Sequence, residues 1–403
     1  MSAVGESAAV GTARGAAGTG APGADPADAV VSDLSEEALL AAFTPLLPGS
    51  DRALVGNGDD CAVLAAPDGR YVVSTDVLVE GHHFRTDWSS AHEIGARAAA
   101  QNLADAAAMG ARPTALVMSL VLPGTTPVAW VRDLARGLAE ACAPVGAGVV
   151  GGDLSGGESL VLAVTVHGDL EGRAPVLRSG ARPGDLLVHV GVPGRSLAGY
   201  ELLAAGWEPN GAPARGASDV TAPAPGPSDV TAPARATSQP GSRSAADVAF
   251  RCQRLFRAPE PPLAAGPALA DAGVTAMMDV SDSLLRDAGR IARASGVLID
   301  VDDPADPGSP LHADVLDLAP VAALLEPDAE SAGRDVSARA RRWVLTGGED
   351  HGMLATVPAD AVDRLPQGAA VIGTVETSAE SGPGVLVGGR PWEGSVGWDH
   401  FSA

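Results

Sequence analysis

Apolar residues recur along this chain at two different spacings, and their order predicts helices and strands in alternation. Helical spacing marks residues 91–109 and 128–142, and in the second range Trp130, Leu134 and Leu138 fall on one face. An earlier helix is expected after Ser35, because serine is a favourable helix cap. Short apolar runs predict strands at 71–73, 116–122, 148–150 and 160–166. This alternation favours an α+β or α/β domain.

The pattern begins again in the second half of the chain. An apolar run at 275–280 leads into Ser281, a good helix cap, and the helix that follows places its apolar residues on one stripe. Further strands are expected at 185–190, 297–301, 343–345, 353–357 and 370–375. We therefore expect an N-terminal domain of mixed sheet and helices at 34–172 and a C-terminal α/β domain at 173–403.

Two segments have a composition that is typical of disorder. Residues 1–33 are rich in Ala, Gly and Ser and lack the continuous apolar core of a signal peptide. Residues 207–246 are dominated by Pro, Ala, Gly and Ser, and Ser-Asp-Val-Thr-Ala-Pro-Ala occurs there twice. Such sequences bury too little apolar surface to offset backbone ordering, which costs roughly 1–2 kcal/mol per residue. We expect a disordered tail and a disordered insertion.

Charge and cysteine content narrow the class of protein. With 50 acidic and 27 basic residues, the net charge of -23 disfavours nucleic acid and anionic membrane as partners. No apolar stretch is long enough to cross a bilayer. The three cysteines, Cys61, Cys142 and Cys252, lack metal-ligand spacing, and an odd number makes a poor disulfide framework. A soluble cytoplasmic protein with reduced thiols is expected.

The 27 basic residues are all arginines, and the chain has no lysine. A Walker A loop and a protein-kinase active site both place a lysine on nucleotide phosphates, and a pyridoxal enzyme needs one for its Schiff base. The sequence therefore excludes these three classes. Any bound phosphate must be met by backbone N–H groups, arginine or a metal ion.

Short acidic motifs occur in three separate regions of the chain, each next to a predicted strand or helix end. Aspartates in similar local settings predict convergence on Mg²⁺, which prefers oxygen ligands and leaves positions for phosphate and water. Taken alone, most of these motifs are explained as well or better by turns and helix caps. Asp105 is the exception, because a carboxylate on the buried face of a helix needs a partner. The motifs are Gly58-Asp59-Asp60, Ser74-Thr75-Asp76, Asn102-Leu103-Ala104-Asp105, Gly152-Asp153 and Asp279-Val280-Ser281-Asp282.

The order and the residues of the motifs from position 58 to 401 resemble those of the thiamine-monophosphate kinases, a family of the superfamily that includes aminoimidazole ribonucleotide synthetase. The segments that carry the resemblance are GDDCAVL at 58–64, STDVLVEGHHF at 74–84, NLADAAAMGARP at 102–113, VVGGD at 149–153, APVLRSGARPGD at 174–185, DVSDSL at 279–284, LTGGED at 345–350 and GWDHF at 397–401.

The resemblance implies transfer of the γ-phosphoryl group of ATP to thiamine monophosphate, several Mg²⁺ ions, a two-domain fold of the aminoimidazole ribonucleotide synthetase type, and a homodimer. It implies roles residue by residue. The metal positions are Asp60, Ser74, Thr75, Asp76, Asp105, Asp153, Asp279 and Asp282, and of these Asp76, Asp105 and Asp282 are the catalytic ones. The ATP positions are Gly152, Asp153, Arg178 and Ser281. The acceptor positions are His83, Glu349 and Trp398.

The chain departs from the family pattern in four places. Leu154 replaces a usual hydroxyl after GGD, and the proline-rich segment at 258–262 lacks an arginine often found there. Ser283 stands where relatives commonly have glycine, and His351, Gly352 and Met353 follow the GGED motif in place of Tyr-Glu-Leu. Two other functions stay open from the sequence. One is a different ATP-dependent synthetase of the same superfamily, and the other is a catalytically silent dimer that binds nucleotide.

Overall fold

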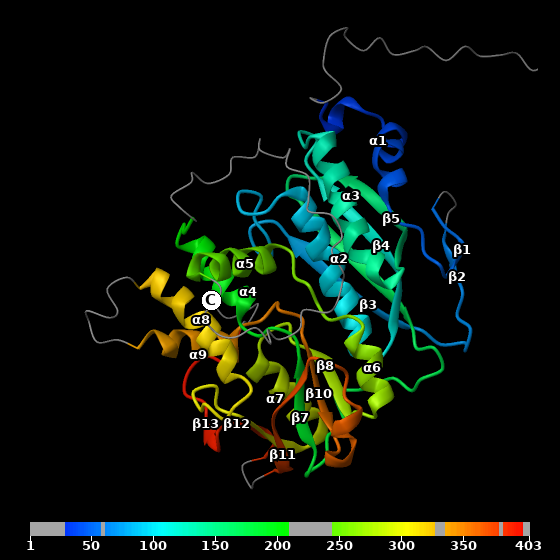
Figure 1. Cartoon of the computed structure of the whole chain (residues 1–403). Helices are drawn as coiled ribbons and strands as arrows, with labels where there is room; N and C mark the ends of the chain where they lie inside the picture. Colours follow the sequence, from blue (N-terminus) through cyan, green and yellow to red (C-terminus); the bar gives the residue numbers. More distant parts are fainter. Residues whose placement is uncertain (1–28, 58–60, 209–243, 327–334, 379–381, 398–403) are drawn as a thin grey trace, which may run out of the picture.

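The computed structural model describes residues 29–57, 61–208, 244–326, 335–378 and 382–397 (Figure 1). Most of the expected tail and insertion, together with Asp60 and Trp398, lies outside these residues. Within the described part, no helix is long and apolar enough to cross a membrane. The expected cytoplasmic location and the expected domain boundary at residue 172 stay predictions.

The N-terminal half is built on a four-stranded sheet in the order β3-β6-β4-β5. The strands are β3 (Val72–Val79), β4 (Arg112–Leu122), β5 (Gly148–Gly156) and β6 (Val161–Asp169). One face of the sheet carries the helices α1 (Glu36–Phe43), α2 (Ala91–Ala108) and α3 (Val128–Cys142). A short hairpin of β1 (Ala53–Val55) and β2 (Val63–Leu64) forms a separate two-stranded sheet.

Close packing of α2 on α3 depends on two glycines. A Cβ atom on Gly95 would lie 2.1 Å from the carbonyl oxygen of Leu134, and one on Gly137 would lie 1.9 Å from that of His92. Any side chain at either position would therefore push the helices apart. The two helices bury Ile94 and Leu138 completely in the core of this half.

The C-terminal half contains a seven-stranded sheet in the order β13-β12-β9-β11-β7-β10-β8. Its strands are β7 (Leu186–Val190), β8 (Ala276–Asp279), β9 (Val297–Val301), β10 (Met353–Val357), β11 (Ala369–Thr377), β12 (Gly384–Val387) and β13 (Arg390–Pro391). Its helices are α4 (Arg195–Ala204), α5 (Ala245–Arg257), α6 (Ala265–Ala272), α7 (Leu284–Ser295), α8 (His312–Leu325) and α9 (Val336–Thr346).

The two halves share a small apolar core. Ala104 and Ala107 on α2 are fully buried, and they pack in one cluster with Leu269 on α6, Met277 on β8 and Met353 on β10. Figure 1 shows α2 running from the N-terminal sheet toward β8 and α6. The helix that carries Asp105 is thus also the element that joins the halves.

Five local expectations were wrong. Ser283, and not Ser281, caps α7. Residues 343–345 belong to α9 and form no strand. Asp76 lies inside β3 and not at its end. Residues 151–153 are part of β5, which pairs with β4, so they make no turn between β5 and β6. Residues 29–33, expected within the tail, bond to the start of α3, with Val31 N–H donating to the carbonyl of Thr126 across 2.8 Å.

Candidate active site

A polar stripe on α2 lies at the centre of the candidate site. Arg97, Gln101 and Asp105 are spaced four residues apart, so they lie on one face of this alanine-rich helix. Asp105 accepts a hydrogen bond of 2.8 Å from the hydroxyl of Ser74, and Gln101 donates one of 3.1 Å to the carboxylate of Asp76. The stripe therefore holds two of the three predicted metal ligands of β3, Ser74 and Asp76, beside Asp105.

Three carboxylates from three elements influence one another here. Burial and, to a smaller extent, the negative charges of Asp279 and Asp76 together raise the pKa of Asp105 to about 7. Asp279 is the last residue of β8 and is almost fully buried. The site thus contains more negative charge than the buried surroundings favour, which is the electrostatic condition for attracting a cation.

His351 is the basic group closest to Asp279. Its Nδ1 atom lies 2.9 Å from the Asp279 carboxylate. Burial alone would lower the pKa of His351, but the hydrogen bond and the charge of Asp279 outweigh it and raise the pKa. His351 is one of the departures from the family pattern, and in this fold it has a defined partner in the site.

Two loops of the C-terminal half, which carry predicted site residues, are joined through their backbones. Glu349 N–H donates to the carbonyl of Ser281 across 2.8 Å, and His351 N–H donates to that of Val280 across 3.0 Å. A Cβ atom on Gly348 would lie 2.4 Å from the carbonyl oxygen of Ser281, so only glycine fits between the loops. Predicted nucleotide and acceptor residues are thereby adjacent.

The loop at 281–283 is organised by a buried carboxylate that sequence reasoning missed. One oxygen of Asp287 accepts the backbone N–H groups of Ser281, Asp282 and Ser283 at 3.0, 3.0 and 3.2 Å. Burial raises the pKa of Asp287 to about 6, although these hydrogen bonds oppose the shift. Arg290 forms ion pairs with both Asp287 and Asp282.

Asp153 and Thr75 lie apart from this cluster. Their burial and register place both side chains on the open face of the sheet, whereas Ser74 and Asp76 face the helices. β3 and β5 are separated by two strands, which is about 14 Å at the usual strand spacing. Their metal roles stay predictions, because within one chain these two side chains do not lie beside Asp105.

A cavity of about 480 Å³ opens beside Gly151 and Gly152. A Cβ atom on Gly152 would lie 2.0 Å from the carbonyl oxygen of Met118, so close strand packing already requires glycine there. Gly151 has open space in front of it, and its backbone is accessible to a ligand. Exposed Cys61 and the ring of Tyr71 also line this cavity.

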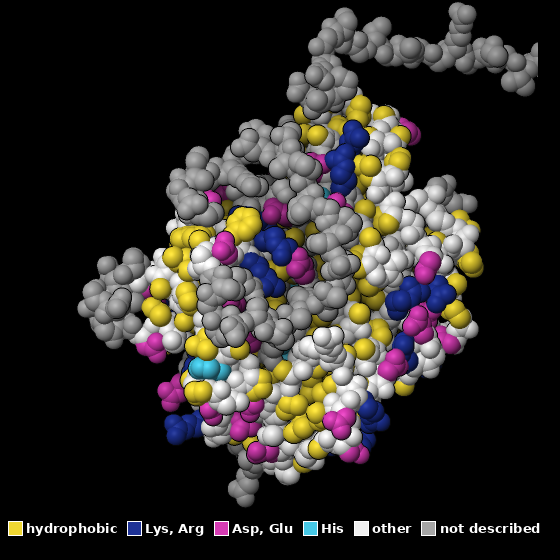
Figure 2. Space-filling model, viewed as in Figure 1, with side chains coloured by type: hydrophobic (Ala, Val, Ile, Leu, Met, Phe, Trp, Pro, Cys, Tyr) yellow, Lys and Arg dark blue, Asp and Glu magenta, His cyan; other side chains and the backbone are white. Residues whose placement is uncertain are grey.

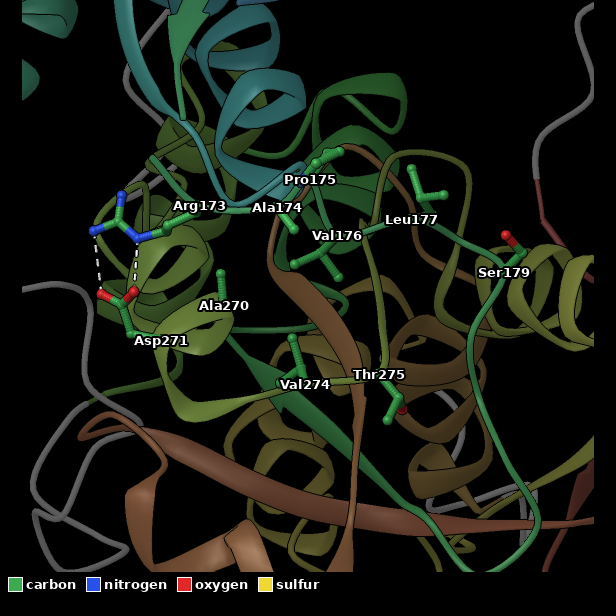
Figure 3. A pocket seen from close by; sticks show the side chains of 10 residues that line it. All are labelled: Arg173, Ala174, Pro175, Val176, Leu177, Ser179, Ala270, Asp271, Val274 and Thr275. Carbon is green, nitrogen blue, oxygen red and sulfur yellow. Dashed lines mark hydrogen bonds and ion pairs between the residues drawn. The ribbon is translucent and has the colours of Figure 1, made fainter. Parts of the chain in front are cut away.

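A second cavity, of about 530 Å³, lies along the segment that connects the halves (Figure 3). Arg173 and Asp271 meet at its edge in a two-pronged ion pair, with distances of 2.7 and 3.1 Å. None of the predicted site residues lines it, although Leu177 and Ser179 on either side of Arg178 do. Arg178 is exposed, and its nucleotide role stays a prediction.

The acceptor residues are only partly placed. His83 is half-buried, and its Nδ1 atom accepts a hydrogen bond of 3.1 Å from Val79 N–H. Glu349 forms an ion pair with buried Arg97. The predicted aromatic group, Trp398, lies outside the described residues, but Val396 and Gly397 before it contact the 281–283 loop.

Mg²⁺ is compatible with this donor set. Within the described ranges, no group of three or more His, Cys, Asp or Glu side chains is close enough to hold a metal, and Asp60 lies outside them. Mg²⁺ usually binds through one or two carboxylates and keeps waters for phosphate to replace, so a complete cage is not required. In Figure 2, arginine and acidic side chains gather near a hollow at the centre of the viewed face.

Comparisons with known sequences point to one family. The family described as AIR synthase related protein, N-terminal domain, matches residues 58–170. The thiamine-monophosphate kinase of Mycobacterium tuberculosis (strain ATCC 25618 / H37Rv) is 41% identical over 349 residues, 86% of this chain and 86% of that protein. The protein of the same name from Corynebacterium glutamicum is 39% identical over 348 residues, 86% of this chain and 88% of that protein.

Solved structures agree. The thiamine-monophosphate kinase from Stenotrophomonas maltophilia K279a matches with a TM-score of 0.61 and 30% identity, over 84% of this chain and 92% of that one. A structure described as AaThiL complexed with AMPPCP and TMP also matches with a TM-score of 0.61, at 27% identity, over 85% of this chain and 91% of that one. These matches confirm the fold expected from the sequence.

Proposed function

The chain belongs to the thiamine-monophosphate kinase family, and we propose that it transfers the γ-phosphoryl group of ATP to thiamine monophosphate, forming thiamine diphosphate. The observation that supports this most strongly is the meeting of Asp76, Asp105 and Asp279 from three elements around one buried helix face. A relative of the same fold was solved with AMPPCP, an ATP analogue, and with TMP. The site is thus suited to bringing two phosphorylated ligands together.

We propose that Asp76, Asp105 and Asp279 contribute to binding several Mg²⁺ ions, each held by one or two carboxylates, with Asp60 and Asp282 as the further aspartates of the set. When bound, the metal supplies positive charge that reduces the repulsion between donor and acceptor phosphates. Ser74 and Gln101 orient two of these carboxylates through their hydrogen bonds. The predicted roles of Thr75 and Asp153 would require a ligand or a second chain that reaches the open sheet face.

The protein's own residues have to position the reactants and need not remove a proton. A phosphate oxygen of the acceptor is already ionised at neutral pH, so a general base is unnecessary and direct in-line transfer is the simplest route. The loop fixed by Asp287 presents Ser281 and Asp282 to the nucleotide. Gly152, Asp153 and Arg178 complete the proposed ATP contacts, while His83, Glu349 and Trp398 serve the acceptor.

We also propose that the open sheet face pairs two chains into a homodimer. Val73 and Val77 are 58% and 47% exposed there, and Leu54 of the neighbouring hairpin is 72% exposed. Exposed apolar groups gathered on one face are typical of an interaction surface. Because Asp153 and Thr75 lie on this face, a second chain would bring further ligands to them.

A direct assay tests the proposal. Purified protein is incubated with ATP, Mg²⁺ and thiamine monophosphate, and ADP and thiamine diphosphate are measured together. Equal amounts of both products, with neither formed when the acceptor is left out, are expected. ADP formation with a different acceptor, and no thiamine diphosphate, would instead favour another synthetase of the superfamily. ATP binding without any transfer would favour a silent nucleotide-binding protein.

A further inference from the structure

Arg97 is a buried cation that links the two halves of the protein. Its residue is 2% exposed, and it comes from α2 of the N-terminal half. Its guanidinium donates to the Glu349 carboxylate and to the backbone carbonyl of Phe256, which follow 252 and 159 residues later in the chain. The same guanidinium lies 5.1 Å from the centre of the Phe256 ring.

The partners of the Arg97 guanidinium indicate its role. A buried charge is costly unless it is paired and hydrogen-bonded, and among the described residues the guanidinium of Arg97 contacts Glu349 and Phe256, both of the C-terminal half. The N-terminal sheet and helices by themselves therefore supply none of these guanidinium contacts. Its interactions form only when the GGED loop and the end of α5 are in place beside α2.

Glu349 is held in an unusual conformation by two restraints. Its φ angle is 62°, a left-handed value that costs free energy for a residue with a side chain. Its N–H bonds to the carbonyl of Ser281, while its carboxylate meets Arg97. The side chain is still 39% exposed, so it is fixed in direction and yet accessible. Strained and accessible residues of this kind are concentrated at functional sites.

The other partner of Arg97 belongs to an aromatic cluster at the same junction. The ring of Phe256 lies 6.2 Å from that of Trp88 and 5.6 Å from that of Tyr200, and Trp88 and Tyr200 are 5.9 Å apart. Trp88 comes from the N-terminal half, whereas Tyr200 and Phe256 come from α4 and α5. Arg97 thus connects the strained carboxylate to a packed contact between the halves.

We propose that Arg97 is a positioning residue for the acceptor: it fixes the direction of the Glu349 carboxylate from across the junction between the halves. The inference rests on the proposed function, because Glu349 binds the acceptor substrate, thiamine monophosphate, only in that reaction. Arg97 acts through Glu349 and does not itself meet the nucleotide. Its loss should therefore weaken the acceptor side of the reaction and leave ATP binding unchanged.

The guanidinium shape is essential to this role. Arginine has donors in a planar fork and reaches two acceptors in fixed directions, whereas lysine is a point charge on a flexible stem. Arg97→Lys should keep the charge and lose part of the geometry. If direction matters as well as charge, the KM of Arg97→Lys for thiamine monophosphate should lie between the values of the wild type and Arg97→Met.

The experiment compares Arg97→Met, Arg97→Lys, Glu349→Gln and the double variant Arg97→Met with Glu349→Gln. Arg112→Met is the matched control, because Arg112 also bonds a carboxylate, Glu171, and a backbone carbonyl, Val145, away from the site. The KM for thiamine monophosphate, kcat, the Kd for an ATP analogue and the melting temperature are measured for each. Hydrogen bonds to charged groups predict an increase of about ten- to a hundredfold in the acceptor KM for Arg97→Met.

The expected pattern is a raised acceptor KM in Arg97→Met, an unchanged ATP-analogue Kd, and a double variant no worse than Glu349→Gln alone. Unchanged acceptor KM values in both Arg97 variants, or effects that add fully in the double variant, would overturn the positioning role. Should Arg97→Met fail to fold, the same comparison is made with Arg97→Lys, alone and combined with Glu349→Gln in a double-mutant cycle. An active wild type with unaffected Arg97 variants rejects only this inference, whereas a wild type that neither binds nor phosphorylates the acceptor rejects the proposed function too.

Discussion

The hydroxyl of Ser74 on β3 donates a hydrogen bond of 2.8 Å to the carboxylate of Asp105 on α2. This contact keeps a partly buried carboxylate fixed although neighbouring Asp76 and Asp279 repel it. A charged group is kept in such surroundings only where something compensates for it. The compensation proposed here is a divalent cation, and the first two predictions test it.

Asp76→Asn and Asp105→Asn should each reduce turnover by about 10²- to 10³-fold, the usual effect of removing a group that stabilises charge in a transition state. The fold should persist, because asparagine keeps one oxygen to accept the hydrogen bonds from Ser74 or Gln101. Steady-state kinetics together with circular dichroism measure both effects. Folded variants with near-normal rates would contradict the metal roles.

The pH dependence of stability should reveal Asp105 in metal-free buffer. Its folded pKa of about 7 exceeds the ordinary value of 3.8, so folding favours the protonated form. That contribution is fully present below about pH 4 and is lost as the pH rises through about 7. Asp105→Asn should therefore gain stability relative to wild type between pH 5 and pH 8, by about 1 kcal/mol or more.

Urea unfolding with EDTA at the two pH values measures this difference. Adding Mg²⁺ at pH 8 should raise the melting temperature of wild type more than that of Asp105→Asn, because the ion then takes the place of the proton. An equal response of both proteins to Mg²⁺ would argue against Asp105 as a ligand.

Local patterns predicted much of the fold. The helix at 128–142 and the strands at 297–301 and 353–357 have the bounds that the sequence indicated. The run at 343–345 was misread because three buried apolar residues have no periodicity that separates strand from helix.

The candidate site was harder to predict, and the reason is sequence separation. The partner of Arg97 lies 252 residues away, so no local signal could connect the two. Gln101 could have been found, because a polar residue four positions before Asp105 in an alanine-rich helix lies on the same face. Strand alternation could likewise have separated Thr75 from Ser74 and Asp76.

Ser283→Gly should weaken acceptor binding. The Ser283 hydroxyl accepts from Arg286 N–H at the start of α7 and donates to the carbonyl of Val396, so it ties the C-terminal segment to the loop that carries Asp282. Glycine, the residue common in relatives, removes both bonds. We expect a severalfold higher KM for thiamine monophosphate, an unchanged KM for ATP, and a loss of only a few tenths of a kcal/mol of stability, because glycine is itself a tolerated helix cap.

Ser244→Ala is the control for that substitution. Ser244 caps α5 by accepting from Asp247 N–H at 3.2 Å, and its side chain bonds to Asp247, which is not a predicted site residue. It should show a stability loss and no change in acceptor KM. A Ser283→Gly protein that behaves like Ser244→Ala would limit Ser283 to helix capping.

Deleting residues 211–242 should leave turnover largely unchanged. The flanking helices are joined without them: Gln253 on α5 donates to the carbonyl of Trp207 across 2.9 Å, and a Cβ atom on Gly199 of α4 would lie 2.1 Å from the carbonyl oxygen of Cys252. Shortening a loop changes closure entropy by only about 0.6 kcal/mol per halving. Kinetics and thermal melting of the deletion variant test this, and lost turnover in a folded protein would assign the segment a function.

Cys61 provides a probe of the cavity that is lined by Gly152, one of the proposed ATP contacts. It is exposed and lines the cavity beside Gly151 and Gly152, whereas burial raises the pKa of Cys142 and Cys252 to about 12 and keeps them unreactive. A thiol reagent should therefore modify one cysteine in the native protein and all of them in denaturant, and Cys61→Ser should abolish the native reaction.

Ligand protection then locates the nucleotide. An ATP analogue with Mg²⁺ should slow the modification of Cys61, because a nucleotide in this cavity covers the thiol, and thiamine monophosphate alone should not. The rate of release of the chromophore from the reagent measures this directly. Calorimetry shows separately whether the analogue binds. If it binds and Cys61 still reacts at its original rate, the nucleotide lies elsewhere, and the ATP contacts proposed for Gly152 and Asp153 are wrong.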